Sequence, residues 1–301
     1  MTISTTALIS RPGTTGPVLE EVDLPPLGPG DLRVEVIAAG VNPVDTWIAA
    51  GFGRDIFGLT GPVGLGWDLT GVVREVGPDV DSFRVGDVVA ADLSNPAAAV
   101  GAQATETVVP ASAAALLPEG LDPVSAASIP LNAITAAQAV ALLGAAEGRT
   151  LLVTGAAGAV GGYAVPLARR AGWVVTGLAR EGDRDFVIGA GADDLVTEVP
   201  SRAFDAVLDA AALQVGALAA VRDGGRFVGV VGGSPLPPER DVTTAAVASQ
   251  ADGALLAELL ALHVDGTLAV RVAGTVPLAE AATAYDKVTG GGQRGRWLLV
   301  P

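Results

Sequence analysis

The 301-residue sequence contains no cysteine and only one histidine, His263. No disulfide can form, and a structural zinc site built on cysteines is excluded. A catalytic zinc would have to be held almost entirely by carboxylates, because cysteine and histidine are the usual zinc ligands. His263 lies in "LLAELLALHVDG", far in sequence from the motifs described below, so we expect it at a helix end and outside catalysis.

Basic residues are also scarce. The chain has 18 Lys and Arg against 33 Asp and Glu, which gives a formal net charge of −15 and an isoelectric point near 4.3. An acidic surface repels phosphate backbones and anionic lipid, so we expect neither nucleic acid nor a membrane as a partner. The first residues, "MTISTTALISRPG", lack a basic region followed by an apolar core. We therefore expect no export signal and a cytoplasmic protein.

One long stretch, residues 124–146, carries no charge at all. It is long enough to span a bilayer, but it is mostly alanine, with polar residues and a proline spread through it. We interpret it as a buried interdomain helix that begins with an Asp122 cap and Pro123 in the first turn.

The chain is half apolar, and its length favours two domains. In the first third, "DLRVEVIAAGV" alternates apolar and polar residues, and "GVVREVG" and "VGDVVAADL" are similar strands between turn residues. This spacing predicts a compact, barrel-like β domain. From Thr150 onward, continuous apolar strands such as "TLLVTG", "WVVTGL" and "FDAVLDAA" alternate with helices. That pattern predicts a parallel sheet covered on both faces, and a strand, a helix and a closing strand follow at the end of the chain.

A glycine-rich loop follows the strand "TLLVTG". Gly155, Gly158 and Gly161 are spaced G-x-x-G-x-x-G, and a helix follows them. In a dinucleotide site such glycines permit a tight turn, a close approach of the backbone to a pyrophosphate, and close packing of helix on strand. The alternative is a simple turn, but the surrounding β-α-β unit favours a dinucleotide.

The residue after the next strand bears on which dinucleotide binds. An NAD site has an acidic residue about 20 positions further on, whereas Arg180 stands 19 residues after Gly161. A guanidinium suits the 2′-phosphate of NADPH, and Arg184 could assist. Glu181 leaves NADH open, because a shift of one residue would bring a carboxylate to the ribose. Both arginines could also be solvated surface charges.

Four further segments support a family assignment. In order they are "AAGVNPVDTWIAAG", "GWDLTGVVREVGPDVDSFRVGDVVA", "GLDPVSAASIPLNAITAAQAV" and "GQRGRWLLV". With the glycine loop, this succession resembles the zinc-free quinone oxidoreductase branch of the medium-chain dehydrogenase/reductase superfamily over nearly the whole chain.

The resemblance implies an α/β protein with a GroES-like, β-rich catalytic domain, residues 1–122 completed by 267–301. A Rossmann domain with a doubly wound parallel sheet, residues 123–266 including the interdomain helix, would bind NADP. The positions that match the zinc ligands of related alcohol dehydrogenases are Asn42 and Trp67, and neither is a suitable ligand. Members of this branch commonly form homodimers.

The implied activity is NADPH-dependent reduction of a quinone or an α,β-unsaturated carbonyl. Two alternatives stay open: a zinc-free alcohol or aldehyde oxidoreductase, and a structural or redox-sensing dinucleotide-binding protein with little turnover. The implied catalytic residues are Asn42, Asp45, Trp47, Asn132 and Thr135. Asn42 and Asp45 could equally cap a helix or turn, Trp47 could pack in the core, and Thr135 could bond its own backbone.

The implied cofactor contacts extend beyond the three glycines. They are Thr135, Ala159, Val160, Arg180, Arg184, and three residues after the strand "RFVGVV", namely Val231, Gly232 and Gly233. Asp209, in "AVLDAA", is expected to organise a strand end and not to act as an acid.

Overall fold

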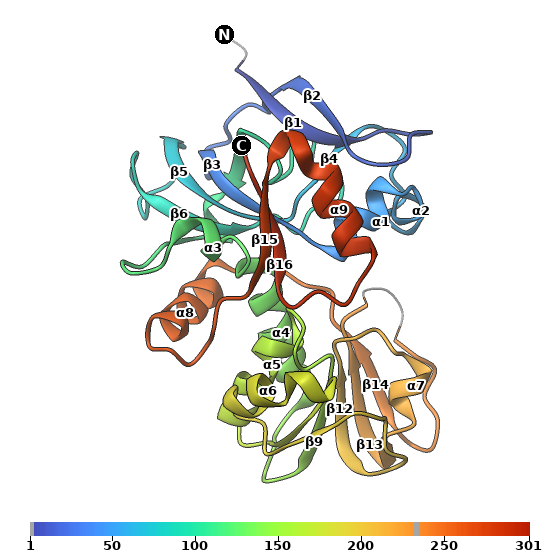
Figure 1. Cartoon of the computed structure of the whole chain (residues 1–301). Helices are drawn as coiled ribbons and strands as arrows, with labels where there is room; N and C mark the ends of the chain where they lie inside the picture. Colours follow the sequence, from blue (N-terminus) through green and yellow to red (C-terminus); the bar gives the residue numbers. More distant parts are fainter. Residues whose placement is uncertain (1–2, 232–234) are drawn as a thin grey trace. The chain divides into compact units, whose positions relative to one another are not determined.

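A computed structural model describes residues 3–231 and 235–301 and divides the chain into two compact units (Figure 1). The first unit comprises residues 1–131, 251–264 and 270–301, and the second comprises residues 132–250 and 265–269. Residues 253–264 form a helix that packs on strand β8 of the first unit, whereas the domain bounds expected from the sequence place them in the second domain.

The first unit is built mainly on antiparallel strands. Its strands are β1 (Ser4–Ser10), β2 (Val18–Asp23), β3 (Asp31–Val41), β4 (Val63–Gly64), β5 (Asp68–Val76), β6 (Val88–Asp92), β7 (Glu106–Pro110), β8 (Ala114–Leu116), β15 (Val272–Pro277) and β16 (Arg296–Val300), of which β15 pairs with β16 in parallel. Its helices are α1 (Pro43–Ala49), α2 (Phe52–Phe57), α3 (Pro123–Ala126), α8 (Gly253–Val264) and α9 (Ala281–Thr289), with short 3-10 turns η1 (Ala111–Ala113) and η3 (Leu278–Glu280).

Strand β3 is the centre of this unit. It pairs with β5, β7 and β16 in a seven-stranded sheet, and β1 joins β2 and β4 in a separate sheet of three strands. Along β3, Leu32, Val34 and Val36 are buried, and they form one apolar core with Leu69 and Val73 of β5. The predicted alternation and the β-rich character of this domain are therefore confirmed.

The second unit contains a six-stranded parallel sheet in the order β11-β10-β9-β12-β13-β14. Its strands are β9 (Thr150–Thr154), β10 (Val174–Leu178), β11 (Asp194–Val196), β12 (Phe204–Asp209), β13 (Val221–Gly229) and β14 (Thr243–Ala246). Helices α4 (Pro130–Leu143), α5 (Gly161–Arg170), α6 (Arg184–Gly189), α7 (Val215–Leu218) and the short turn η2 (Glu181–Asp183) accompany them. The predicted parallel sheet is confirmed, and the strand order reverses direction between β9 and β12, which is where such sheets bind ligands.

The charge-free stretch is two helices and not the single helix predicted. Asp122 caps α3, since its Oδ2 accepts a hydrogen bond from the Ser125 N–H at 2.9 Å, as predicted. The helix ends at Ala126 because Pro130 cannot continue it and starts α4 instead. In the part of the chain that the structure describes, no helix has the length and apolarity needed to cross a membrane.

Candidate functional site

The glycine loop joins β9 to α5 in the second unit. Gly155 has a positive φ of 58°, which disfavours any residue with a side chain. A Cβ on Gly161 would lie 2.1 Å from the Gly155 carbonyl oxygen, so only glycine lets the first turn of α5 pack this closely on the end of β9. The spacing of glycines seen in the sequence thus has a steric cause.

The same loop presents unpaired backbone donors. Ala159 and Val160 are half-buried, and their N–H groups have no hydrogen-bond acceptor among the residues that the structure describes. They directly precede the ten-residue helix α5. A helix start with free N–H groups attracts anions, and a pyrophosphate would satisfy these donors.

Asp209, at the end of β12, shapes the neighbouring loop. Its side chain is buried and accepts hydrogen bonds from the Thr154 hydroxyl at 2.6 Å and from the Gln214 N–H at 2.7 Å. Thr154 ends β9, so one carboxylate ties together the two strand ends on either side of the point where the strand order reverses. These contacts organise the strand end, as expected, and the absence of an acid role for Asp209 stays a prediction.

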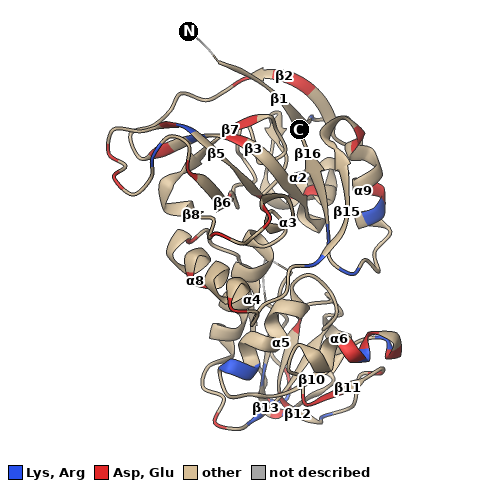
Figure 2. Cartoon of the chain, turned by 60° about the vertical axis from the view of Figure 1, so that its left-hand side comes forward, with Lys and Arg blue, Asp and Glu red and all other residues tan. Residues whose placement is uncertain are grey.

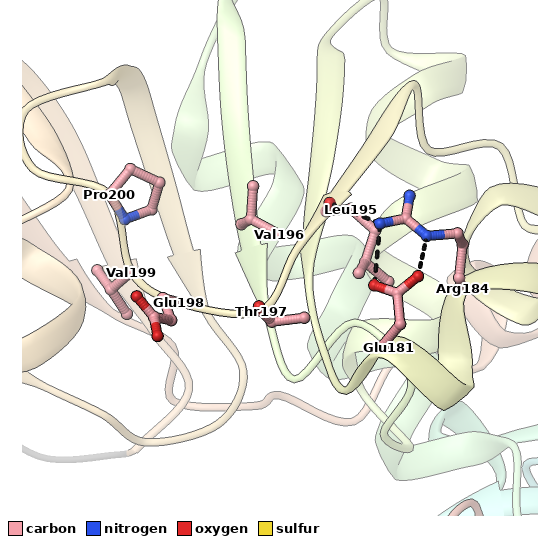
Figure 3. A pocket seen from close by; sticks show the side chains of 8 residues that line it. All are labelled: Glu181, Arg184, Leu195, Val196, Thr197, Glu198, Val199 and Pro200. Atoms are coloured by element: carbon pink, nitrogen blue, oxygen red, sulfur yellow. Dashed lines mark hydrogen bonds and ion pairs between the residues drawn. The ribbon is translucent and has the colours of Figure 1, made fainter.

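A pocket of about 420 Å³ lies beyond the ends of β10 and β11 (Figure 3). Its lining residues are Glu181, Arg184, Leu195, Val196, Thr197, Glu198, Val199 and Pro200. Acidic and basic residues stand together around α6 (Figure 2). Arg184 donates to both carboxylate oxygens of Glu181, at 2.6 and 3.0 Å, and this pair holds the pKa of Glu181 below its usual value.

The two candidate arginines therefore differ. Arg184 is already engaged by Glu181 and lies 3.7 Å from a carboxylate oxygen of Asp194. Arg180 is exposed after β10 and has no ion pair with any residue in the described ranges 3–231 and 235–301. Of the two, Arg180 is the guanidinium that is free to meet a phosphate.

In the first unit, Asn42 and Asp45 meet at the start of α1. Asn42 is the N-cap residue, and its N–H donates to Asp45 Oδ2 at 2.7 Å as part of a capping box. Asp45 Oδ1 accepts from the Gly66 N–H at 3.0 Å. Burial raises the pKa of Asp45 to about 7, although these backbone hydrogen bonds oppose the shift. Asp45 thus holds the segment that carries Asn42.

The side chain of Asn42 is held by a residue that the sequence analysis did not select. Its Nδ2 donates to Asp68 Oδ1 at 2.7 Å. Asp68 is fully buried at the start of β5, and a Cβ on Gly40 would lie only 2.4 Å from Oδ1. Burial raises the pKa of Asp68 to about 7, with Arg296 opposing the shift and Asp45 adding to it.

Two polar side chains extend this network to the C-terminal part of the chain. Tyr285, on α9, donates to Gln103 Oε1 at 2.7 Å, and Gln103 Nε2 donates to the Gly40 carbonyl at 2.9 Å. Gln103 Nε2 also lies 3.4 Å from Asp45 Oδ2. Burial raises the pKa of Tyr285 well above its ordinary value, so it stays a neutral donor.

Aromatic side chains gather on α1, α2 and the adjacent loop. Trp47 is half-buried, with its ring centroid 5.8 Å from that of Phe52. Trp67 packs in the same way on Phe57, at 6.0 Å. Phe52 is 50% exposed. Packing accounts for the buried part of Trp47, while stacking on an acceptor stays a prediction.

The remaining predicted residues lie in separate places. Asn132 and Thr135 are buried on α4 of the second unit, so their proximity to Asn42 stays a prediction. Val231 is half-buried just after β13, whereas Gly232 and Gly233 lie outside the described residues. His263 is buried in the last turn of α8, at the helix end where it was expected.

The donor set does not fit a catalytic zinc. Asn42 already donates its amide to Asp68, and Trp67 offers no ligand atom. Within residues 3–231 and 235–301, no three His, Cys, Asp or Glu side chains are grouped so that they could hold a metal ion.

Two protein-family models match the chain. Residues 28–119 match the alcohol dehydrogenase GroES-like domain, and residues 183–299 match a zinc-binding dehydrogenase. A β-rich unit of this kind defines a two-domain dehydrogenase-type fold when it occurs with a six-stranded parallel sheet in which a glycine loop follows strand β9. The chain belongs to the medium-chain dehydrogenase/reductase superfamily, and its relatives include quinone oxidoreductase homologues.

Individual relatives match only part of their own length. The chain is 34% identical to the chloroplastic quinone-oxidoreductase homolog of Spinacia oleracea over 58% of this chain and 55% of that protein. It is 33% identical to a human mitochondrial NAD(P)H oxidoreductase over 56% of this chain and 46% of that one. It is 30% identical to the 2-methylene-furan-3-one reductase of Solanum lycopersicum over 74% and 60%. The matches thus span about half of each relative.

A solved structure matches the whole chain. An alcohol dehydrogenase superfamily protein from Novosphingobium aromaticivorans is 29% identical, has a TM-score of 0.86, and covers 99% of this chain and 100% of its own. The expected fold class, a GroES-like β-rich domain with a Rossmann-type domain, is therefore confirmed.

Proposed function

We propose that the protein is an NADPH-dependent oxidoreductase that transfers a hydride to a quinone or an α,β-unsaturated carbonyl without a metal ion. The observation that carries the cofactor part is the glycine loop. Gly161 lets α5 approach β9, and the free N–H groups of Ala159 and Val160 precede that helix. This arrangement suits the pyrophosphate of a dinucleotide.

The preference for NADPH is supported by the charges after β10. Arg180 is exposed and unpaired among the described residues, so it can bind a 2′-phosphate through charge-assisted hydrogen bonds. Both carboxylate oxygens of Glu181 accept hydrogen bonds from Arg184, so Glu181 is less available to a ribose hydroxyl. We assign Arg180 as the main contact to the phosphate, with Arg184 secondary to it.

The acceptor class follows from what the residues can supply. The bound nicotinamide supplies a hydride, and the acceptor needs no Lewis acid if its negative charge spreads from carbon onto a conjugated oxygen. A proton from water completes the two-electron reduction. Asn42 has an amide donor suited to the developing enolate oxygen, and Trp47 has a flat face suited to a conjugated ring. Asp45 positions Asn42 through its backbone N–H.

Steady-state consumption of NADPH with a quinone panel, an enone panel and simple alcohols or aldehydes tests this proposal. We expect turnover with quinones or enones and little with the simple compounds. Preferential oxidation of simple alcohols would contradict it. Tight NADPH binding without turnover of any acceptor would instead support a structural or redox-sensing protein. We also propose a homodimer, which sedimentation analysis can test.

A further inference from the structure

Asn42 is held at both its backbone and its side chain by buried acids. Asp45 accepts from its N–H and Asp68 accepts from its Nδ2, each at 2.7 Å. The last torsion of an asparagine side chain has no sharp preference of its own, so an anchor decides where the amide points. Asp68 is one such anchor at the amide.

The backbone next to Asp68 leaves room for its carboxylate. Gly40 leaves the space that Oδ1 occupies, since a Cβ there would lie 2.4 Å from it. Asp68 is fully buried, and its second oxygen, Oδ2, has no hydrogen-bond partner in the described part of the chain. A buried carboxyl with one unsatisfied oxygen is costly for stability, and the one oxygen of Asp68 that is hydrogen-bonded holds the Asn42 amide.

The charged groups around Asp68 come from three further elements. Asp45 lies on α1 and Asp92 stands directly opposite on β6, while Arg296, at the start of β16, is the positive charge that acts on Asp68. Both acids disfavour the ionised form of Asp68 and Arg296 favours it. The protonation state of Asp68 therefore depends on the opposing effects of these three neighbours.

We propose that Asp68 is a positioning residue for the hydride transfer, fixing the amide of Asn42 toward the acceptor. This inference rests on the proposed function. The ionised carboxylate can only accept, so it binds Nδ2 and sets a single orientation. The protonated carboxyl can donate to the Asn42 Oδ1 as well as accept, so the amide can turn. The ordered arrangement thus belongs to the ionised form of Asp68.

The test compares Asp68→Asn with Asp92→Asn. Asp92 is equally buried on the paired strand, but its Oδ1 accepts from the Ser94 hydroxyl and its Oδ2 has no hydrogen-bond partner in the described part of the chain. At pH 8 we expect Asp68→Asn to lower kcat about tenfold or more, as for a lost hydrogen bond to a charged group. The KM for the acceptor and the Kd for NADPH should stay within about twofold of wild type, because Asp68 positions Asn42 and does not itself bind either ligand.

The pH profile separates positioning from simple destabilisation. Wild-type kcat should rise relative to Asp68→Asn as pH increases through about 7, where burial sets the pKa of Asp68. Asp92→Asn should remain close to wild-type kcat at pH 8 and keep that rise, at a slightly lower pH because an acid that opposes the ionisation of Asp68 is removed. A parallel pH profile for wild type and Asp68→Asn, or equal losses in both variants, would overturn the proposal.

A second measurement does not depend on turnover. The side-chain amide signals of Asn42 in the ¹⁵N NMR spectrum of the wild-type protein, assigned by their loss in Asn42→Ala, should shift as pH passes through neutrality. Unchanged signals would refute the role of Asp68. If no acceptor is reduced while the signals do shift, the proposed function fails and the coupling of Asp68 to Asn42 stands.

Discussion

Replacing Asp92 with asparagine should stabilise the protein above pH 6. Asp92 is fully buried in β6, and its Oδ2 has no hydrogen-bond partner among the described residues. Burial raises the pKa of Asp92 from 3.8 to about 6, although hydrogen bonds from Ser94 oppose the shift. The folded protein therefore keeps a proton that the unfolded chain releases between these two pH values.

The sign and size of the effect follow from this difference. The contribution of Asp92 to stability is fully present below its unfolded pKa of 3.8 and is lost as pH rises through its folded pKa of about 6. At about 1.4 kcal/mol per pKa unit, the loss at pH 8 is about 3 kcal/mol. Weakening the Ser94 hydrogen bond costs the variant about 1 kcal/mol. The net gain at pH 8 is thus about 2 kcal/mol, with no gain at pH 4.

Urea unfolding followed by tryptophan fluorescence measures this, because Trp47, Trp67 and Trp297 all report on the first unit. The urea midpoints of wild type and variant are compared at pH 4.5 and pH 8. The comparison requires that the slope of the unfolding free energy against urea concentration is the same for both proteins. Asp79→Asn, an exposed acid in the turn after β5, is the matched control and should change little at either pH. An equal effect of Asp92→Asn at both pH values would refute the electrostatic reasoning.

Three predictions concern the cofactor. Arg180→Ala should weaken NADPH binding by about tenfold or more and leave NADH within about twofold, measured by fluorescence titration; an unchanged ratio would show that another residue meets the 2′-phosphate. Glu181→Gln should release Arg184 and raise the NADPH-to-NADH affinity ratio about threefold, and a fall in the ratio would contradict this. Gly161→Ala should abolish binding of both cofactors, since its Cβ would meet the Gly155 carbonyl at 2.1 Å, so retained affinity by calorimetry would show that the loop can relax.

The fold was largely predictable because its signals are local. The alternation in "DLRVEVIAAGV" and the continuous apolar strand "TLLVTG" each report how many faces of a strand are buried, and both strands form as expected. The break before α4 was missed, although Pro130 disfavours helix in the residue that precedes it. The steric effect of Pro130 was sufficient to predict this break, but the prediction gave more weight to the alanine-rich composition.

The site was harder to predict because its key contacts are distant in sequence. Asn42 and Asp68 are 26 residues apart and meet only through the pairing of β3 with β5. Asp68 was visible only as a charged residue opening an apolar strand, a signal that also fits an exposed strand end. By contrast, the Glu181–Arg184 pair could have been anticipated, since residues three apart on one turn commonly form ion pairs.

The central sheet of the first unit has a consequence for synthesis. Strand β3 borders β16, and the hydrogen bond from Tyr285 reaches Gln103 across 182 residues. A ribosome finishes the second unit's segment, residues 132–250, before it makes either partner. The end of β3 that pairs with β16, residues 39–41, therefore lacks this partner while a later part of the chain can already fold. The sheet around β3 is thus begun before the second unit is made and completed only after it.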